Sequence, residues 1–275
     1  MLFRSAYHGQ HPEGVTSLVG SDPPALPQPD PAGTGAPWVE RDVLVAPYND
    51  LAATEQILTD HAADLAAVIV EPLHRCITPV DGFLQGLREA TAKRGIVLVF
   101  DEVVTGFRLA LGGAQEYYGV SPDLVAYGKG LGGGFPIGAF GGRADIMEAV
   151  NEQRLPGPNY AWSASTTGGN PVSAAAALAT IDLFSEPGVY DRLHAMGRLL
   201  RERLGRRAWP SGRDGAGARR RAAGAVGIPR SPGALPPRLA RRRPPARPRR
   251  DAGNAAAGRV PQPDGHQALP LPGAR

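Results

Sequence analysis

The sequence predicts an α/β domain over residues 1–205, with a mainly parallel sheet and flanking helices, followed by a disordered tail over residues 206–275. Short apolar runs alternate with segments of helical periodicity between residues 66 and 149, an order typical of parallel sheets. Apolar residues make up 42% of the chain, which is enough for a core. The tail is indicated by its composition, because Arg, Pro, Gly and Ala account for 53 of its 70 residues.

The predicted strands are short apolar runs bounded by turn residues. Residues 66–72 (AAVIVEP) are β-branched at the centre and closed by Pro72. The second strand covers residues 96–102 (IVLVFDE) and the third residues 123–127 (DLVAY). Residues 135–141 (FPIGAFG) are a candidate fourth strand.

Three helices are predicted from periodicity and capping residues. The first begins after a cap at Asp81 and ends at Gly95. The second covers residues 170–185, with Asn170 as its cap. The third covers residues 190–204 and carries its apolar residues along one face: Leu193, Met196, Leu200 and Leu204.

Charge divides the chain at the same place. Residues 1–205 carry 14 basic and 23 acidic side chains, whereas residues 206–275 carry 16 Arg and three acids. Such a tail cannot bury enough apolar surface to offset its chain entropy, so we expect disorder. A reading-frame error near residue 205 of a GC-rich gene would produce this mixture. We prefer that hypothesis to a nucleic-acid-binding tail, which would be expected to carry aromatic residues and lysine.

The remaining composition indicates a cytoplasmic protein. The single Cys76 excludes an internal disulfide, is typical of a reducing compartment and is expected to be a buried thiol. No apolar run approaches the ~18 residues of a membrane helix, and the first residues contain no secretory signal. The six histidines show no metal-ligand spacing, so we expect no metal and scattered surface histidines.

Lys129 is the first candidate for chemistry. It is one of two lysines among 28 arginines, and it lies between a predicted strand and a run of glycines. A lysine amine can lose its proton and attack a carbonyl, which arginine cannot do. The other lysine, Lys93, is expected to be a solvated residue of the first helix. The stretch also matches G-x-G-x-x-G, but strand or loop residues follow where a dinucleotide site needs a helix.

Asp101 is the second candidate, because it ends an apolar strand where an unpartnered carboxylate is costly to bury. One interpretation is a helix cap or an ion pair with Arg108. The other is a partner for a cofactor cation, such as a protonated pyridine nitrogen. Val103 would face the same side if the strand continued, and would then pack beneath an aromatic ring.

The chain resembles the class III pyridoxal-phosphate aminotransferases, above all the branch containing glutamate-1-semialdehyde aminomutase. The similar segments follow the family's order: AYHG (6–9), APYND (46–50), VIVEP (68–72), VFDEVVTGFRLALGGAQEYYGVSPDL (99–124), YGKGLGGGFPIGAFGG (127–142) and STTGGNPVSAAAALA (165–179). The resemblance implies pyridoxal 5'-phosphate as cofactor. It also implies the large domain of the fold-type I pyridoxal-phosphate transferases, which we expect to be incomplete here.

The resemblance also implies roles for individual residues. Lys129 matches the lysine that forms a Schiff base with the cofactor and then moves protons. Asp101 matches the acid that pairs with the pyridine nitrogen. Val103 and Tyr7 match the residues on the two faces of the ring. Thr166 matches a threonine that binds the cofactor phosphate, usually from a neighbouring subunit, which implies a homodimer.

The implied activity is the transfer of an amino group of a small amino acid or amine, by a transaminase or an aminomutase. The family's phosphate-binding loop and its C-terminal domain are expected to be missing, so an inactive fragment is the alternative. Residues 71–79 (EPLHRCITP) are shorter than the aminomutase segment and lack its asparagine, although Glu71 matches a family glutamate near the site. We expect neither a membrane partner nor a nucleic-acid partner.

Overall fold

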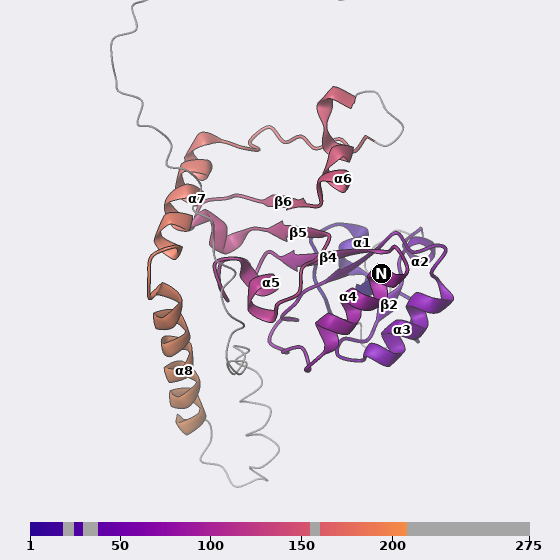
Figure 1. Cartoon of the computed structure of the whole chain (residues 1–275), viewed down its shortest axis with the longest axis horizontal. Helices are drawn as coiled ribbons and strands as arrows, with labels where there is room; N and C mark the ends of the chain where they lie inside the picture. The colour runs from indigo at the N-terminus through magenta and orange to yellow at the C-terminus, as the bar shows by residue number, and fades with distance from the viewer. Residues whose placement is uncertain (19–24, 30–37, 155–159, 208–275) are drawn as a thin grey trace, which may run out of the picture. The chain divides into compact units, whose positions relative to one another are not determined.

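The computed structural model describes residues 1–18, 25–29, 38–154 and 160–207, and the predicted tail lies outside them. Its framework is a four-stranded sheet in which β3, β4 and β5 run parallel and β6 runs antiparallel to β5 (Figure 1). The strands are β3 (Ala67–Val70), β4 (Val97–Glu102), β5 (Leu124–Tyr127) and β6 (Ala139–Gly142). The predicted α/β class is confirmed, and the candidate fourth strand begins four residues later than expected.

β4 has strands on both sides, and its side chains alternate between two environments. Leu98 and Phe100 are fully buried, whereas Val99 and Asp101 lie on the opposite, half-buried face. This period-2 alternation is that of a pleated strand. The register pairs Val70 with Phe100 on one side and Asp101 with Ala126 on the other, so the carboxyl ends of the three parallel strands lie at one edge.

The N-terminal segment runs beside β3. β1 (Leu2–Phe3) pairs in parallel with β2 (Val45–Ala46). The Met1 amino group donates to the Ala67 carbonyl at 2.8 Å, and the Ile69 N–H donates to the Met1 carbonyl at 3.0 Å. These bonds fix β1 beside β3, so the residues that follow β1 lie near the carboxyl ends of the parallel strands.

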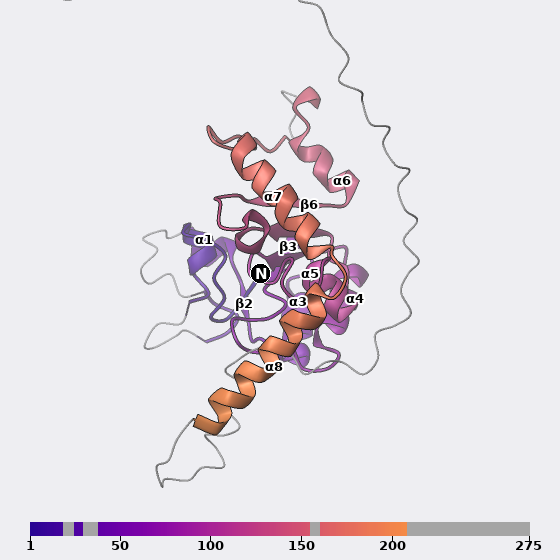
Figure 2. The ribbon, with the colours of Figure 1, turned by 90° about the vertical axis from the view of Figure 1, so that its left-hand side faces the viewer.

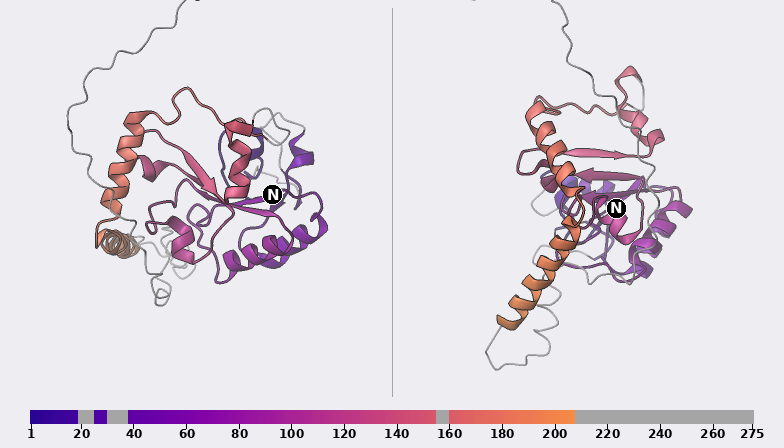
Figure 3. Two further views of the ribbon diagram at one scale, coloured as in Figure 1. Left: turned by 45° about the horizontal axis from the view of Figure 1, so that its top comes forward. Right: turned by 60° about the vertical axis from the view of Figure 1, so that its left-hand side comes forward.

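Two helices, α3 (Leu51–Asp60) and α4 (Phe83–Lys93), contact each other and pack their apolar faces into the core (Figure 3). The first predicted helix is confirmed as α4, and Lys93 is exposed in its last turn as expected. The prediction of an Asp81 cap is wrong. Gly82 occupies the cap position with φ +82°, a left-handed conformation that glycine adopts without strain, and no side chain caps this end.

A buried carboxylate fixes the loop that follows β4. Glu102 is fully buried and accepts hydrogen bonds from the backbone N–H of Ala114 and Gln115, at 2.5 and 3.1 Å, and from the Thr105 hydroxyl at 3.0 Å. It thereby holds the start of α5 (Gly113–Tyr118) against the end of β4. Burial raises the pKa of Glu102, and these donors oppose that rise by favouring the ionised form.

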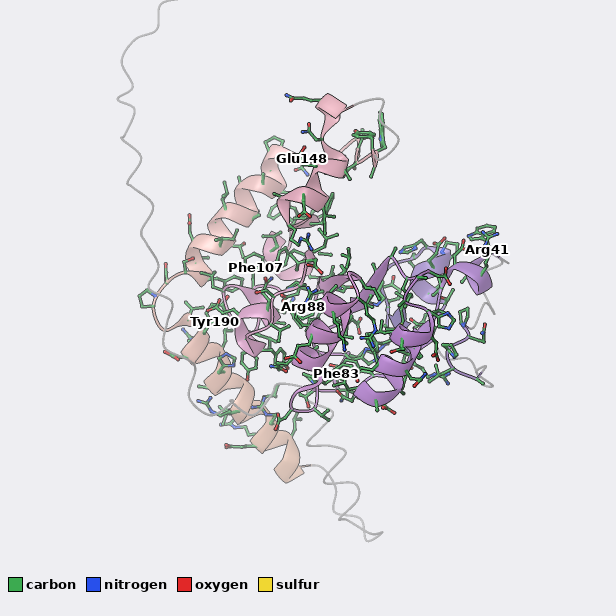
Figure 4. The ribbon with its side chains drawn as sticks, turned by 45° about the vertical axis from the view of Figure 1, so that its right-hand side comes forward. Arg41, Phe83, Arg88, Phe107, Glu148 and Tyr190 are labelled. Atoms are coloured by element: carbon green, nitrogen blue, oxygen red, sulfur yellow. The ribbon has the colours of Figure 1, made fainter. Side chains whose placement is uncertain are left out.

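The last two described helices are α7 (Pro171–Phe184) and α8 (Val189–Arg207), nearest the viewer in Figure 2. Asn170 caps α7 by accepting from the Ser173 N–H at 2.9 Å, as predicted. α8 is tied to the loop after β4, because the Tyr190 hydroxyl donates to the Phe107 carbonyl at 3.0 Å (Figure 4). The predicted apolar face of α8 is exposed at all four of its positions: Leu193, Met196, Leu200 and Leu204.

The remaining elements are short. The helical turns are α1 (Pro12–Val15), α2 (Val39–Asp42), α6 (Ala144–Met147), η1 (Lys129–Gly132), η2 (Glu148–Val150) and η3 (Glu152–Arg154). Within the described residues, no helix has the length and apolar character needed to cross a membrane, and no cluster of three His, Cys, Asp or Glu could hold a metal. The prediction of a buried Cys76 is wrong, since its thiol is exposed on a turn.

Candidate active site

A pocket of about 530 Å³ lies beyond the carboxyl ends of the parallel strands. The segment after β3, the end of β4 with the turn that follows it, and the turn after β5 each contribute to its wall, as expected for an open parallel sheet. The N-terminal segment contributes the other wall. The polar and aromatic residues that line the pocket are Tyr7, His8, Glu71, Arg75, Asp101, Thr105 and Lys129.

Asp101 is held by two donors. The His8 ring Nδ1 lies 2.7 Å from Asp101 Oδ2, and the Val103 N–H donates to Oδ1 at 3.1 Å. Both side chains are largely shielded, with 4% of His8 and 14% of Asp101 exposed. Because an ionised carboxylate only accepts, the pair requires a proton on His8 Nδ1. The opposite ring atom, His8 Nε2, is buried without a hydrogen-bond partner among the described residues.

The His8–Asp101 pair corrects two expectations. Asp101 pairs with His8, and the structure shows no Arg108 ion pair at this carboxylate. The prediction of scattered surface histidines is wrong for His8 and for His74, which is 2% exposed. His8 was not predicted as a residue of the candidate site. The signal available was its position directly after Tyr7 in the AYHG segment.

Lys129 opens the short 3₁₀ turn η1 directly after β5. Its φ of +39° is left-handed, a strained conformation that clusters at functional sites when the surroundings enforce it. The glycines allow close packing around it. A Cβ on Gly132 would lie 2.9 Å from Ile137 Cγ2, and one on Gly133 would meet the Thr180 hydroxyl of α7. The glycine-rich stretch therefore lets the turn pack between Ile137 and α7, and no α-helix starts there.

The structure brings four of the five predicted site residues together. Tyr7, Asp101, Val103 and Lys129 all line the pocket, although Val103 lies in the turn after β4 and not in the strand itself. Thr166 does not line the pocket and is exposed in the turn before α7. The turns and helices that follow β6 thus leave Thr166 free to face solvent or another chain.

Glu71 and His74 form a buried pair beside the pocket. Glu71 Oε2 and His74 Nδ1 are 3.3 Å apart without hydrogen-bond geometry, and the His74 ring stacks on Tyr48 with centroids 4.7 Å apart. Burial raises the pKa of Glu71 and is the largest effect; His8 and Arg75 act to lower that pKa, and the Asp101 carboxylate acts to raise it. Burial lowers the pKa of His74 to about 4, and the charges of Arg75 and His8 act in the same direction. Both shifts favour the neutral forms of the pair.

The His74 shift predicts loss of stability in acid. The pKa of His74 is about 4 in the folded protein and 6.5 in the unfolded chain. The neutral His74 ring therefore contributes to the free energy of unfolding above pH 6.5, and this contribution is lost as the pH falls toward 4. A shift of this size corresponds to about 3 kcal/mol. Urea unfolding at pH 7 and pH 4 should show that the wild type loses more stability than His74→Phe, which keeps the ring stack and cannot be protonated. Equal losses in both proteins would contradict the prediction.

Comparison with known proteins identifies the family. The family model for aminotransferase class III matches residues 1–213. The chain belongs to the class III aminotransferases. Among relatives of this class III chain, glutamate-1-semialdehyde 2,1-aminomutase of Thermomicrobium roseum is 46% identical over 205 residues, covering 74% of the chain and 46% of the relative. The corresponding aminomutase 2 of Brevibacillus brevis is 45% identical over 207 residues, covering 74% and 47%.

Solved structures agree with the family. An omega-transaminase from Sphaerobacter thermophilus superposes with a TM-score of 0.68 at 38% identity, covering 75% of the class III chain and 49% of that protein. A transaminase with bound PLP gives a TM-score of 0.66 at 26% identity, covering 76% and 50%. The class III chain described here therefore spans about half the length of the relatives that it matches.

Proposed function

We propose that this chain belongs to an enzyme that transfers an amino group with pyridoxal 5'-phosphate. The observation that carries the proposal is that Lys129 and Asp101, 28 residues apart in the sequence, line one pocket at the carboxyl ends of neighbouring strands. The names of the relatives, aminomutases and transaminases, support the same reaction class.

The pocket residues fit the ring of this cofactor. A volume of about 530 Å³ lies within the roughly 300–1,000 Å³ typical of small-molecule sites. The Asp101 carboxylate suits a protonated ring nitrogen, while Tyr7 and Val103 offer an aromatic and an aliphatic surface for its two faces. When bound, the cofactor supplies an aldehyde that condenses with amines and a ring that accepts the electron pair of the substrate carbanion.

The protein groups then have separate tasks. The Asp101 carboxylate would pair with the ring nitrogen and favour a proton on it. His8 and the Val103 N–H orient the carboxylate by occupying one oxygen each. Lys129 Nζ would hold the cofactor through its aldehyde, and the same amine would take and return the proton of the substrate α-carbon. The shielded His8–Asp101 pair keeps water away from the charged end of the ring.

Thr166 enters the proposal through a second copy of the chain. It is exposed and lies outside the pocket, which is the arrangement needed if it binds the cofactor phosphate in a neighbouring subunit. A homodimer is therefore part of the proposal. We also propose that the protein works in a reducing compartment such as the cytoplasm, and the exposed, unpaired thiol of Cys76 supports this location. An amino acid or amine is the proposed substrate.

Trapping the cofactor with borohydride tests the proposal. The full chain is mixed with pyridoxal phosphate, reduced and mapped by mass spectrometry. We expect the adduct at Lys129, its loss in Lys129→Ala, and its persistence in the matched variant Lys93→Ala, which removes the exposed lysine. Mapping also distinguishes an adduct at Lys129 from one at the Met1 amino group, which is a second candidate amine because burial lowers its pKa to about 6. Labelling of wild type and Lys129→Ala to the same extent would contradict the proposal, and absence of any adduct would favour an inactive fragment.

The same preparation separates the two kinds of transfer. A transaminase needs a keto acid to take up the nitrogen, whereas an aminomutase returns the substrate skeleton with its amine relocated. Product analysis with a labelled amine and no added keto acid distinguishes them.

A further inference from the structure

Arg75 stands at the tip of a two-residue turn in the pocket wall. The His74 N–H donates to the Ile77 carbonyl at 3.1 Å and the Ile77 N–H to the His74 carbonyl at 2.8 Å, which leaves Arg75 and Cys76 at the tip. Arg75 has a φ of +55°, a left-handed conformation in which Gly and Asn are favoured. The turn geometry alone would therefore not select arginine.

Contacts with neighbouring residues fix both the base of this turn and the guanidinium of Arg75. The buried His74 ring stacks on Tyr48, which fixes the base of the turn. Arg75 Nε donates to the Ser5 carbonyl at 2.7 Å. That bond uses the inner nitrogen and leaves the two terminal nitrogens of the guanidinium available. The side chain is thus oriented before any ligand arrives.

None of the acidic side chains that line the pocket forms an ion pair with the Arg75 guanidinium. Asp101 is paired with His8, and Lys129 is committed to the cofactor in the proposed function. Glu71 lies nearby, and the Arg75 charge acts to lower its pKa, but burial is the largest effect and raises that pKa. Across the part of the chain that the structure describes, no carboxylate forms an ion pair with Arg75. A guanidinium with two free terminal nitrogens matches the two oxygens of a carboxylate in a fork.

The sheet order places Arg75 and Lys129 on opposite sides of Asp101. The turn with Arg75 lies in the segment that follows β3, Asp101 is the penultimate residue of β4, and Lys129 lies in the turn that follows β5. Neighbouring strands are about 4.8 Å apart, so the β3 and β5 ends are separated by roughly 10 Å. Arg75 and Lys129 line the same pocket. A small molecule whose amine is at Lys129 can therefore present a second group to Arg75.

We propose that Arg75 binds a carboxylate of the substrate, so that the enzyme acts on amino acids in preference to simple amines. This inference rests on the proposed amino transfer. The cofactor phosphate is also an oxyanion and is the other group that a guanidinium could hold. The two sources are distinguished below by probing a carboxylate and the cofactor separately.

The test uses Arg75→Asn in the full chain without cofactor. Asparagine accepts the left-handed backbone, so the turn should persist and thermal stability should not fall. The probes are succinate, which has carboxylates and no amine, and 1,4-diaminobutane, which has amines and no carboxylate. We expect calorimetric titration to show succinate binding that weakens at least tenfold in Arg75→Asn and less in Arg75→Lys. The diamine should not distinguish the proteins.

The matched control is Arg41→Asn. Arg41 is an exposed arginine on α2 whose guanidinium pairs with the adjacent Asp42 at 2.7 Å (Figure 4), and its replacement should leave succinate binding unchanged. Wild-type affinity for succinate in Arg75→Asn, or no succinate binding by the wild type, would overturn the inference. Weaker pyridoxal phosphate binding with unchanged succinate binding would assign Arg75 to the phosphate and would also overturn it.

Activity of the loaded enzyme supplies an independent check. Loss of a carboxylate contact made equally in ground and transition states raises KM and leaves kcat nearly unchanged. We expect this pattern in Arg75→Asn for an amino acid and not for a plain amine. The succinate titration requires no cofactor, so its result does not depend on the borohydride experiment. Succinate binding can be absent although Lys129 forms a cofactor adduct, and it can be present although Lys129 forms none. The inference and the proposed function are therefore tested separately.

Discussion

Replacement of Asp101 by asparagine is expected to slow amino transfer by about 10²–10³-fold, the usual effect of removing one preorganised electrostatic group. Asparagine has nearly the same shape and keeps an oxygen for the Val103 N–H. Its amide nitrogen, however, is a donor and would face the donor His8 Nδ1, now held 2.7 Å from the carboxylate. The charge that holds a proton on the cofactor nitrogen would also be lost.

The rate should be measured in single turnovers with an amino acid donor and saturating pyridoxal phosphate. Asp81→Asn is the matched control, because Asp81 is exposed and its side chain does not cap α4. The control should transfer amine at the wild-type rate. A rate for Asp101→Asn within threefold of wild type would show that the carboxylate has no part in the reaction.

Replacement of Phe100 by alanine is expected to lower the free energy of unfolding by about 3–5 kcal/mol. Phe100 is fully buried in β4, directly before Asp101, and packs within the core formed with α4. Removing the ring loses apolar burial and leaves a cavity that the rigid sheet cannot close. Since domains are stable by only about 5–15 kcal/mol, this single change removes a large fraction of the total.

Urea denaturation followed by circular dichroism measures this loss. Phe140→Ala is the control, because Phe140 lies on β6 with 54% of its surface exposed and should change stability by no more than about 0.5 kcal/mol. Similar losses in the two variants would mean that β4 does not form the centre of the core. A loss confined to Phe100→Ala supports the packing described here.

The strands and long helices were predictable because their signals are local. Val68 to Val70 and Val97 to Phe100 are continuous apolar runs, which are typical of strands in a parallel sheet. The cap at Asn170 was predictable for the same reason, since its partner is Ser173, three residues away. Asp81 shows the limit of local signals, because the N-cap position of α4 is occupied by the next residue, Gly82, in a left-handed conformation.

Lys129 and Asp101 were predictable as site residues from residue chemistry and family resemblance. Their surroundings depended on contacts between distant segments. His8 lies 93 residues from Asp101, and Arg75 lies 70 residues from the Ser5 carbonyl that holds it. Neither pairing leaves a periodic pattern in the sequence.

The sequence by itself thus determined which segments become strands and helices and which two residues are suited to amine chemistry. Only the tertiary structure decided that β6 turns antiparallel, that His8 holds Asp101, and that Arg75 enters the same pocket. The physical reason is that backbone propensity and hydrophobic period act over a few residues. Charge pairing and pocket shape depend on distances that exist only after the chain has packed.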